Sequence, residues 1–289
     1  MKRNKNNAIK SGNTAILTFF LVVFLLYAFT LVFPFVWIFY NSFKNKLDFW
    51  DNPMGLPARW SPGNYINVFK VLSADNFNLS NMFFNSFTLL VGQVAAALFV
   101  CVCAAYVVSK YKFPGRTAVY FIAILIMFIP TTGSLVVYYT LMQDLRFYDN
   151  YLGMIVSHAS GFGFGFLILY GFFKSISWSY AEAAFIDGAG SFTVFFRIML
   201  PMAKSVLVAL AVLNSIGVWN DYMGQMLFYP SHPTVAVGLQ NLSQSIVKYE
   251  SEYPLFFCAI LICTIPVIAL YASCQKIIVK NTMAGGLKG

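Results

Sequence analysis

The side chains in this sequence that are best suited to bind or react with a ligand are a few polar groups inside long apolar segments. His158 lies in one such segment, and Asn220 and Asp221 lie in another. An ionisable group inside a membrane costs at least about 2.5 kcal/mol unless it is compensated, which makes it a candidate for function. We expect these groups to border a path or gate for a polar solute. The alternatives are a helix-to-helix hydrogen bond for His158 and simple solvation of Asp221 near a membrane surface.

Three glycines follow His158 closely. Gly161, Gly163 and Gly165 alternate with phenylalanine. The spacing of Gly161 and Gly165 is typical of membrane helices that pack closely. A helix that is opened locally and lines a path is the other interpretation. Because neither a preceding strand nor a third glycine at the required place is present, the segment does not match a dinucleotide-binding fingerprint.

Other kinds of chemistry find little support in the sequence. The phosphate-binding pattern Gly-x-x-x-x-Gly-Lys-Ser/Thr does not occur. The two histidines, His158 and His232, are far apart in sequence, and the five cysteines lie in or at the ends of apolar segments, where cysteine usually behaves as a small hydrophobe. We expect no catalytic, cofactor-binding or metal-binding residues in this chain.

The elements that must position these groups are membrane-spanning helices. The 289 residues are 59% hydrophobic and 10% charged, far from the roughly 25% charged residues of soluble domains. A span needs about 20 mainly apolar residues. The segments that satisfy this are 11–43, 76–109, 117–143, 150–173, 205–228 and 253–275. The fold is therefore predicted to be all-α, with six transmembrane helices in a single domain over residues 1–289.

The distribution of basic residues predicts the orientation of these spans. Thirteen Lys and Arg residues lie on the side of both termini and six on the other side. By the positive-inside rule both termini are cytoplasmic. The first apolar segment is too long for a cleaved signal peptide, which has an apolar region of about 7 to 15 residues. The external loops are 41–81, 142–151 and 229–252, and the two long ones are either a landing surface for an external partner or simple connectors.

The connection between the fourth and fifth spans, residues 174–204, has a pattern of its own. Ser179 and Glu182 fit a capping box, and Gly188 after Asp187 supplies a left-handed helix stop. Ser191 can cap a second short helix with an apolar face. Such a face packs either against the chain's own helices or against another protein.

This loop resembles that of the membrane permeases of bacterial ABC importers. Their signature is Glu-Ala-Ala, three residues, Gly, nine residues and Ile-x-Leu-Pro, and the chain matches every spacing. The matching residues are Glu182, Ala183, Ala184, Gly188, Ile198, Leu200 and Pro201, with Asp187 also typical of the family. The resemblance implies that these residues couple the spans to a cytoplasmic ATPase.

The resemblance narrows to the shorter, six-span partner of the maltose-type carbohydrate permeases. It is carried by patches such as 34–37, 85–86, 113–116 and 219–221, and by the end of the chain. It implies a bacterial cell-membrane protein that pairs with a second homologous permease, two ABC ATPase subunits that bind ATP and magnesium, and an extracellular solute-binding protein. The cytoplasmic tail 275–289, including Gly285, Gly286 and Lys288, would contact the ATPase. No nucleic-acid partner is expected.

Three other functions remain open on the sequence alone. A permease of the same type for a solute that is not a sugar would share the loop. An ion-coupled carrier would need intramembrane carboxylates, for which only Asp221 qualifies. A membrane enzyme would need paired carboxylates, a histidine cluster or an activated nucleophile. The leading hypothesis is import of a sugar, with an oligosaccharide favoured.

Overall fold

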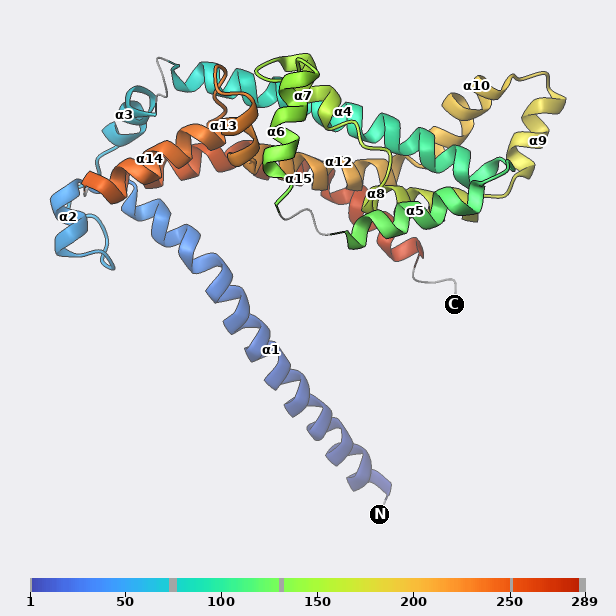
Figure 1. The fold of residues 1–289 in the computed structure, drawn as a ribbon. Helices are drawn as coiled ribbons and strands as arrows, with labels where there is room; N and C mark the ends of the chain where they lie inside the picture. Colours follow the sequence, from blue (N-terminus) through green and yellow to red (C-terminus); the bar gives the residue numbers. More distant parts are fainter. Residues whose placement is uncertain (1, 73–76, 130–132, 250–251, 286–289) are drawn as a thin grey trace. The chain divides into compact units, whose positions relative to one another are not determined.

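The computed structural model describes residues 2–72, 77–129, 133–249 and 252–285, and the regular elements in these ranges are helices. The chain divides into two compact units. Unit 1 contains residues 1–71 and 242–262, and unit 2 contains residues 72–241 and 263–289. The predicted all-α class is confirmed by these elements, which Figure 1 shows in chain order.

Unit 1 begins with α1 (Lys2–Asn41), a long helix that matches the first predicted span. Its stretch Ile16–Asn41 is apolar over 26 residues, which at 1.5 Å per residue is long enough to cross a bilayer. Two short helices follow, α2 (Lys46–Asp51) and α3 (Gly63–Val71). The first predicted external loop therefore has helical structure of its own.

A buried lysine organises the loop that follows α1. The Nζ atom of Lys44 donates hydrogen bonds of 2.6 Å to the carbonyl oxygens of Asn52 and Gly55. Asn64 donates through Nδ2 to the carbonyl oxygens of Ser42 and Lys44. Burial lowers the pKa of Lys44, because the charged form loses hydration, with a smaller opposite effect from Asp48. These bonds replace the water that the loop carbonyls would otherwise need.

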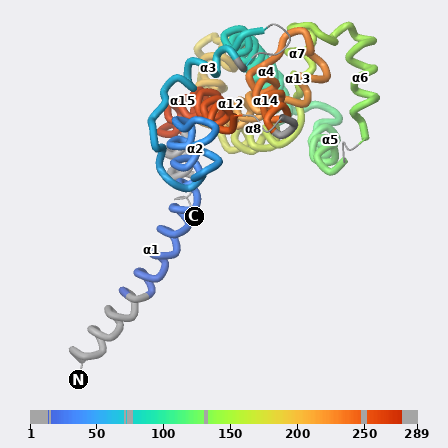
Figure 2. Tube along the Cα trace, turned by 90° about the vertical axis from the view of Figure 1, so that its left-hand side faces the viewer, coloured from blue at the N-terminus to red at the C-terminus, as the bar shows by residue number. Residues whose placement is uncertain are grey.

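Unit 2 is built around α4 (Leu79–Lys110), which matches the second predicted span. Its neighbours are α7 (Tyr151–Ser157), α8 (Phe164–Ser175) and α12 (Lys204–Asn220). The contacts of α4 are most extensive with α8 and α12. Figure 2 shows α5 (Arg116–Phe128) and α6 (Leu135–Asp144) toward the edge of the unit. The core at the C-terminal half of α4 contains Tyr106, Phe173 and Phe195.

The predicted spans differ in how continuous they are. Those at 11–43, 76–109 and 253–275 are single helices, the last being part of α15 (Tyr253–Gly285). The other three each contain two shorter helices, and the one at 205–228 consists of α12 and α13 (Met223–Phe228). By length and composition, three described helices can cross a membrane, or four if the bent pair Ser191–Met202 and Lys204–Asn220 is one span.

The last predicted external loop, residues 229–252, also contains a helix. It is α14 (Val235–Tyr249), which continues from unit 2 into unit 1. At its start, the backbone N–H of Val235 donates to the Oγ atom of Ser86 on α4 over 2.9 Å. The loop is therefore tied to the helix bundle of unit 2 at this point.

Candidate functional site

The loop with the seven-residue signature forms a hairpin of two helices, α9 (Ser179–Ile186) and α10 (Ser191–Val194), which lies beyond the C-terminal end of α4 (Figure 1). At the end of α9, Gly188 has a φ of +82°, a conformation that other residues rarely adopt. The N–H of Gly188 bonds to the carbonyl of Phe185 at 3.0 Å, and that of Ala189 to Ala184 at 2.9 Å. These are the two bonds of a Schellman motif, so the predicted left-handed stop is present.

The two predicted helix caps are not formed. Ser179 is the first residue of α9 and Trp178 holds the N-cap position in a helical conformation, so the capping box with Glu182 is wrong. Ser177 takes over part of this role, since its Oγ accepts from the N–H of Ser179 at 3.3 Å. Ser191 likewise begins α10, with Gly190 at its N-cap and no side-chain bond there. Both helices thus begin at the serine itself, one residue earlier than they would if the serine were the N-cap.

After α10 the backbone widens and then turns. Residues Phe195–Met199 form a π-helix, followed by α11 (Leu200–Met202). Pro201 has no N–H to donate, so the helical hydrogen-bond pattern is interrupted at this residue. The helix axis bends by 72° between Met202 and Lys204. Pro201 therefore lies at the junction of the loop and the next apolar helix, as predicted, and Ile198 and Leu200 are half-buried beside it.

One face of the hairpin is anchored in the core of unit 2. Ala181, Val194 and Met199 are fully buried, and the ring of Phe195 lies 4.8 Å from that of Tyr106. Lys110, the last residue of α4, donates through Nζ to the carbonyl oxygen of Ile176 over 2.5 Å. This bond satisfies a carbonyl near the C-terminal end of α8 with a positive charge, which the helix dipole favours.

The other face of the hairpin leaves apolar side chains uncovered. Ile186 is 86% exposed and Phe192 is 82% exposed. Ala184 is half-buried, and the remaining predicted coupling residues of this part are exposed, namely Glu182, Ala183, Asp187 and Gly188. Large apolar side chains left exposed on a loop can contact another protein. The hairpin is thus held on one side and available for contact on the other.

A second feature is a cavity in the middle of unit 2. It has a volume of about 450 Å³ and lies between α4, α12 and the segment that joins α7 to α8. Residues 158–163 of this segment are not helical, and Gly163 has a φ of +130°. His158 and Gly165 line the cavity. A Cβ atom on Gly161 would lie 3.3 Å from Val100, so this glycine allows close approach to α4.

The geometry at the glycines corresponds to a locally opened helix. Gly161 precedes α8 and Gly165 lies inside it, so the two are not one turn apart on a continuous helix. Gly165 does pack closely, since an added Cβ would lie 3.4 Å from the Sγ atom of Cys101. Close packing and an opened backbone therefore occur together in this segment.

Asn220 and Asp221 are not among the described residues that line the cavity. Asn220 donates through Nδ2 to the carbonyl oxygen of Ile216 at 2.8 Å. Asp221 ends α12, and its Oδ1 accepts from the N–H of Gly224 at 2.9 Å, at the start of α13. Both groups have local backbone partners, and their role in a path or gate stays a prediction.

Two cavity residues were not among the sequence candidates. Gln93 on α4 is 1% exposed, whereas Asn214 on α12 is exposed; both line the cavity. Each is an amide inside an apolar segment, a signal that resembles the one given by His158. Only the packing of α4 against α12 and α7 shows that they face the same space.

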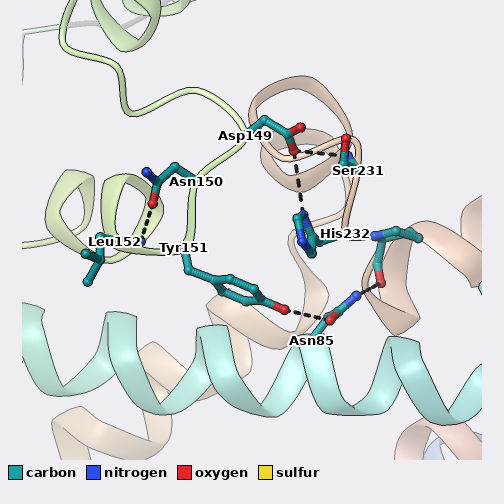
Figure 3. Close-up of polar contacts among 8 residues, drawn as sticks. Asn85, Asp149, Asn150, Tyr151, Leu152, Ser231 and His232 are labelled. Carbon is teal, nitrogen blue, oxygen red and sulfur yellow. Dashed lines mark hydrogen bonds and ion pairs between the residues drawn. The ribbon is translucent and has the colours of Figure 1, made fainter.

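A third feature is a polar network around Asn85, shown in Figure 3. Asn85 is buried; its Nδ2 donates to the carbonyl oxygen of Pro233 at 3.0 Å, and its Oδ1 accepts from the hydroxyl of Tyr151 at 2.7 Å. Asp149 accepts from the N–H of Ser231 at 3.0 Å and lies 3.8 Å from the Nδ1 atom of His232. We call these residues the Asn85 network; it ties the two later predicted external loops to α4.

The predicted tail site lies mostly outside the described residues. Gly286 and Lys288 are in the range 286–289, and Gly285 is the last residue of α15. In the part of the chain that the structure describes, His, Cys, Asp and Glu side chains form no group of three that could hold a metal ion.

Comparison with known proteins gives consistent results over most of the chain. The family model of the binding-protein-dependent transport system inner membrane component matches residues 97–283. The probable starch degradation products transport system permease protein AmyC of Thermoanaerobacterium thermosulfurigenes is 30% identical over 88% of this chain and 91% of its own length. The diacetylchitobiose uptake system permease protein NgcG of Streptomyces coelicolor is 28% identical over 90% of this chain and 85% of its own.

A solved structure has the same fold. One chain of a bacterial ABC transporter involved in the import of the acidic polysaccharide alginate aligns with a TM-score of 0.74. The alignment covers 88% of this chain and 93% of that chain at 24% sequence identity.

Proposed function

The chain belongs to the family of binding-protein-dependent transport system inner membrane components, and we propose that it is the six-span permease subunit of an ATP-driven importer of oligosaccharides. The family is that of ABC transporter permeases, and the relatives named above are permeases for starch degradation products and for diacetylchitobiose. The hairpin of α9 and α10 is the single observation that carries the proposal. It combines a buried anchor with an uncovered apolar tip.

In this proposal the hairpin tip seats in a cytoplasmic ATPase subunit. Movement of the ATPase is transmitted through the anchored face, because Phe195 and Met199 pack into the same core as Tyr106 on α4. The bend of 72° at Ala203 then connects the hairpin directly to α12, which borders the cavity. ATP and magnesium are bound by two such ATPase subunits and not by this chain, and the tail from residue 275 makes a second contact with them.

The proposed topology has six spans with both termini in the cytoplasm of a bacterium. The asymmetry of thirteen Lys and Arg residues against six supports it. Spans made of two short helices are compatible with a membrane where the opened backbone is buried in protein or lines a water-filled cavity. The segment 158–163 meets this condition, since it borders the cavity. A second homologous permease completes the path, and an extracellular binding protein delivers the sugar.

Reconstitution tests the proposal directly. The chain is purified with the proteins encoded beside it, and sugar uptake into proteoliposomes is measured with and without ATP and with and without the binding protein. We expect uptake only when both are present and only when an ATPase subunit co-purifies. Uptake driven by a sodium or proton gradient without an ATPase would contradict the proposal, as would chemical turnover of the sugar by the isolated chain.

A further inference from the structure

The cavity in unit 2 has an unusual set of polar side chains. Gln93, His158, Ser160 and Asn214 line it, and no Lys, Arg, Asp or Glu is found among its lining residues in the described part of the chain. Its remaining lining is aliphatic and aromatic side chains, Cys101 and glycine. A pocket with a few uncharged polar groups on apolar walls suits a neutral polar ligand.

Two of these groups share one backbone partner. Gln93 Nε2 lies 3.3 Å from the carbonyl oxygen of Met154, and His158 Nδ1 lies 3.2 Å from the same oxygen. A carbonyl oxygen can only accept, so the groups suited to face it are the amide nitrogen of Gln93 and a protonated Nδ1 of His158; the hydroxyl of Ser157 donates to the same oxygen at 2.9 Å. In the neutral imidazole, Nε2 of His158 is then an acceptor. Oε1 of Gln93 is buried and has no hydrogen-bond partner among the described residues.

The polar groups on the other walls also use their donors on backbone carbonyl oxygens. Asn214 donates through Nδ2 to the carbonyl oxygen of Leu210 at 2.8 Å, which leaves its Oδ1 as an acceptor. The hydroxyl of Ser160 donates to the carbonyl oxygen of Phe162 at 3.0 Å. In each of these side chains a backbone carbonyl takes a donor, and the acceptor is left over. Among these acceptors Oε1 of Gln93 is buried without a partner within the described residues, which is costly, so a ligand that donates a hydrogen bond to it is favoured.

Backbone donors border the same cavity. Gly163 precedes α8 without a side-chain cap, and the first residues of α8, Phe164 to Phe166, line the cavity. The first N–H groups of a helix have no partner within it. A hydroxyl group both donates and accepts, so a polyhydroxylated ligand can use the side-chain acceptors and these N–H groups together. A carboxylate can use only the N–H groups and is opposed by the oxygen atoms of Gln93 and Asn214.

From this arrangement we propose that Gln93, His158 and Asn214 form a subsite that accepts hydrogen bonds from the hydroxyl groups of an uncharged saccharide. The inference rests on the proposed function, because it assigns the cargo of the same import path. The rings of Phe162 and Phe164, which are 39% and 61% exposed, supply apolar surface for the faces of the sugar ring. The subsite selects against acidic sugars on this subunit's side of the path.

Uptake by the complete transporter tests the subsite. Wild type is first assayed in proteoliposomes, with its ATPase, partner permease and binding protein, against maltotriose, diacetylchitobiose, arabinotriose and trigalacturonate. The variants Gln93→Leu and Asn214→Leu are then compared with wild type on the sugar that is imported. Gln143→Leu is the matched control, because this exposed amide of α6 is outside the cavity. We expect each cavity variant to lower uptake at limiting sugar about three- to tenfold, the effect of one hydrogen bond, and the control to have no effect.

A fluorinated sugar separates loss of the acceptor from damage to the fold. Replacing one hydroxyl of the imported sugar by fluorine preserves its size and removes its donor. For at least one hydroxyl position, we expect wild type to discriminate against the analogue and Asn214→Leu or Gln93→Leu to discriminate less. The same binding protein is used throughout, so its own preference cancels in the ratio of variant to wild type.

The possible outcomes separate the subsite from the proposed function. If wild type imports no saccharide in an ATP-dependent manner, the proposed function fails. If it imports a neutral sugar but both cavity variants match the control and discriminate as wild type does, the subsite is wrong. Import of trigalacturonate at a rate equal to that of the neutral sugars would overturn the selection against acidic sugars.

Discussion

The hairpin of α9 and α10 and the Asn85 network lie in the same unit, yet their side chains are satisfied in different ways. In the hairpin, Ile186 and Phe192 are 86% and 82% exposed. In the network, Asn85 is 5% exposed and both polar atoms of its amide are hydrogen-bonded within the chain. The amide of Asn85 has its partners within the chain, whereas the hairpin leaves apolar area that another protein can cover. Changes in the hairpin should therefore affect transport, and changes in the network should affect stability.

The largest effect is expected at Gly188. A Cβ atom there meets no atom of the chain within 4 Å, but its φ of +82° strains any residue other than glycine and, to a lesser degree, asparagine. If the glycine only ends α9, Gly188→Ala and Gly188→Phe should be equally impaired and Gly188→Asn less so. If Gly188 instead lies against a partner protein, the size of the new side chain determines how much uptake is lost. We expect Gly188→Phe to lower ATP-driven uptake at least about a hundredfold, roughly 2.7 kcal/mol, and Gly188→Ala to lower it much less.

Membrane insertion and thermal stability of the Gly188 variants are measured beside uptake. We expect the melting temperature of the purified chain to differ little between Gly188→Ala and Gly188→Phe, because the added ring meets open space. Equal uptake by these two variants would contradict the expectation that the hairpin contacts a partner, and with it the contrast with the Asn85 network.

An intermediate effect is expected for Asn85→Leu. The substitution leaves the carbonyl oxygen of Pro233 and the hydroxyl of Tyr151 buried without their partner. We expect it to destabilise the chain by about 1 to 3 kcal/mol, measured as a lower melting temperature in detergent. Uptake per assembled complex should stay close to wild type. Asn81→Leu is the control, since it makes the same change one turn earlier on α4 at an exposed position.

The smallest effects separate two neighbouring tyrosines, whose rings are 4.9 Å apart. The hydroxyl of Tyr151 donates to Asn85, so Tyr151→Phe should cost about 1 kcal/mol. Burial raises the pKa of Tyr229, and its buried hydroxyl has no hydrogen-bond partner within the described residues. Tyr229→Phe should therefore be neutral or slightly stabilising. A larger loss of thermal stability for Tyr229→Phe than for Tyr151→Phe would contradict this assignment of the hydrogen bond to Tyr151.

The helical class, the approximate positions of the apolar segments and the location of the hairpin could be predicted from the sequence. Hydrophobicity along a chain is a local property, and a residue such as Gly188 acts through its own backbone angle. The helix starts were less predictable. Ser179 and Ser191 can each cap a helix, but the choice depends on how Trp178 and Gly190 are held by the rest of the unit.

What the sequence determined by itself is the family and the position of the hairpin, because the spacing from Glu182 to Pro201 lies within one short segment of the chain. The tertiary structure alone decided which amides face the cavity and which polar groups close the Asn85 network. Gln93 and His158 are far apart in sequence, yet a side-chain nitrogen of each lies within 3.3 Å of the carbonyl oxygen of Met154. Such long-range contacts depend on how separate helices pack, and no local pattern of residues records them.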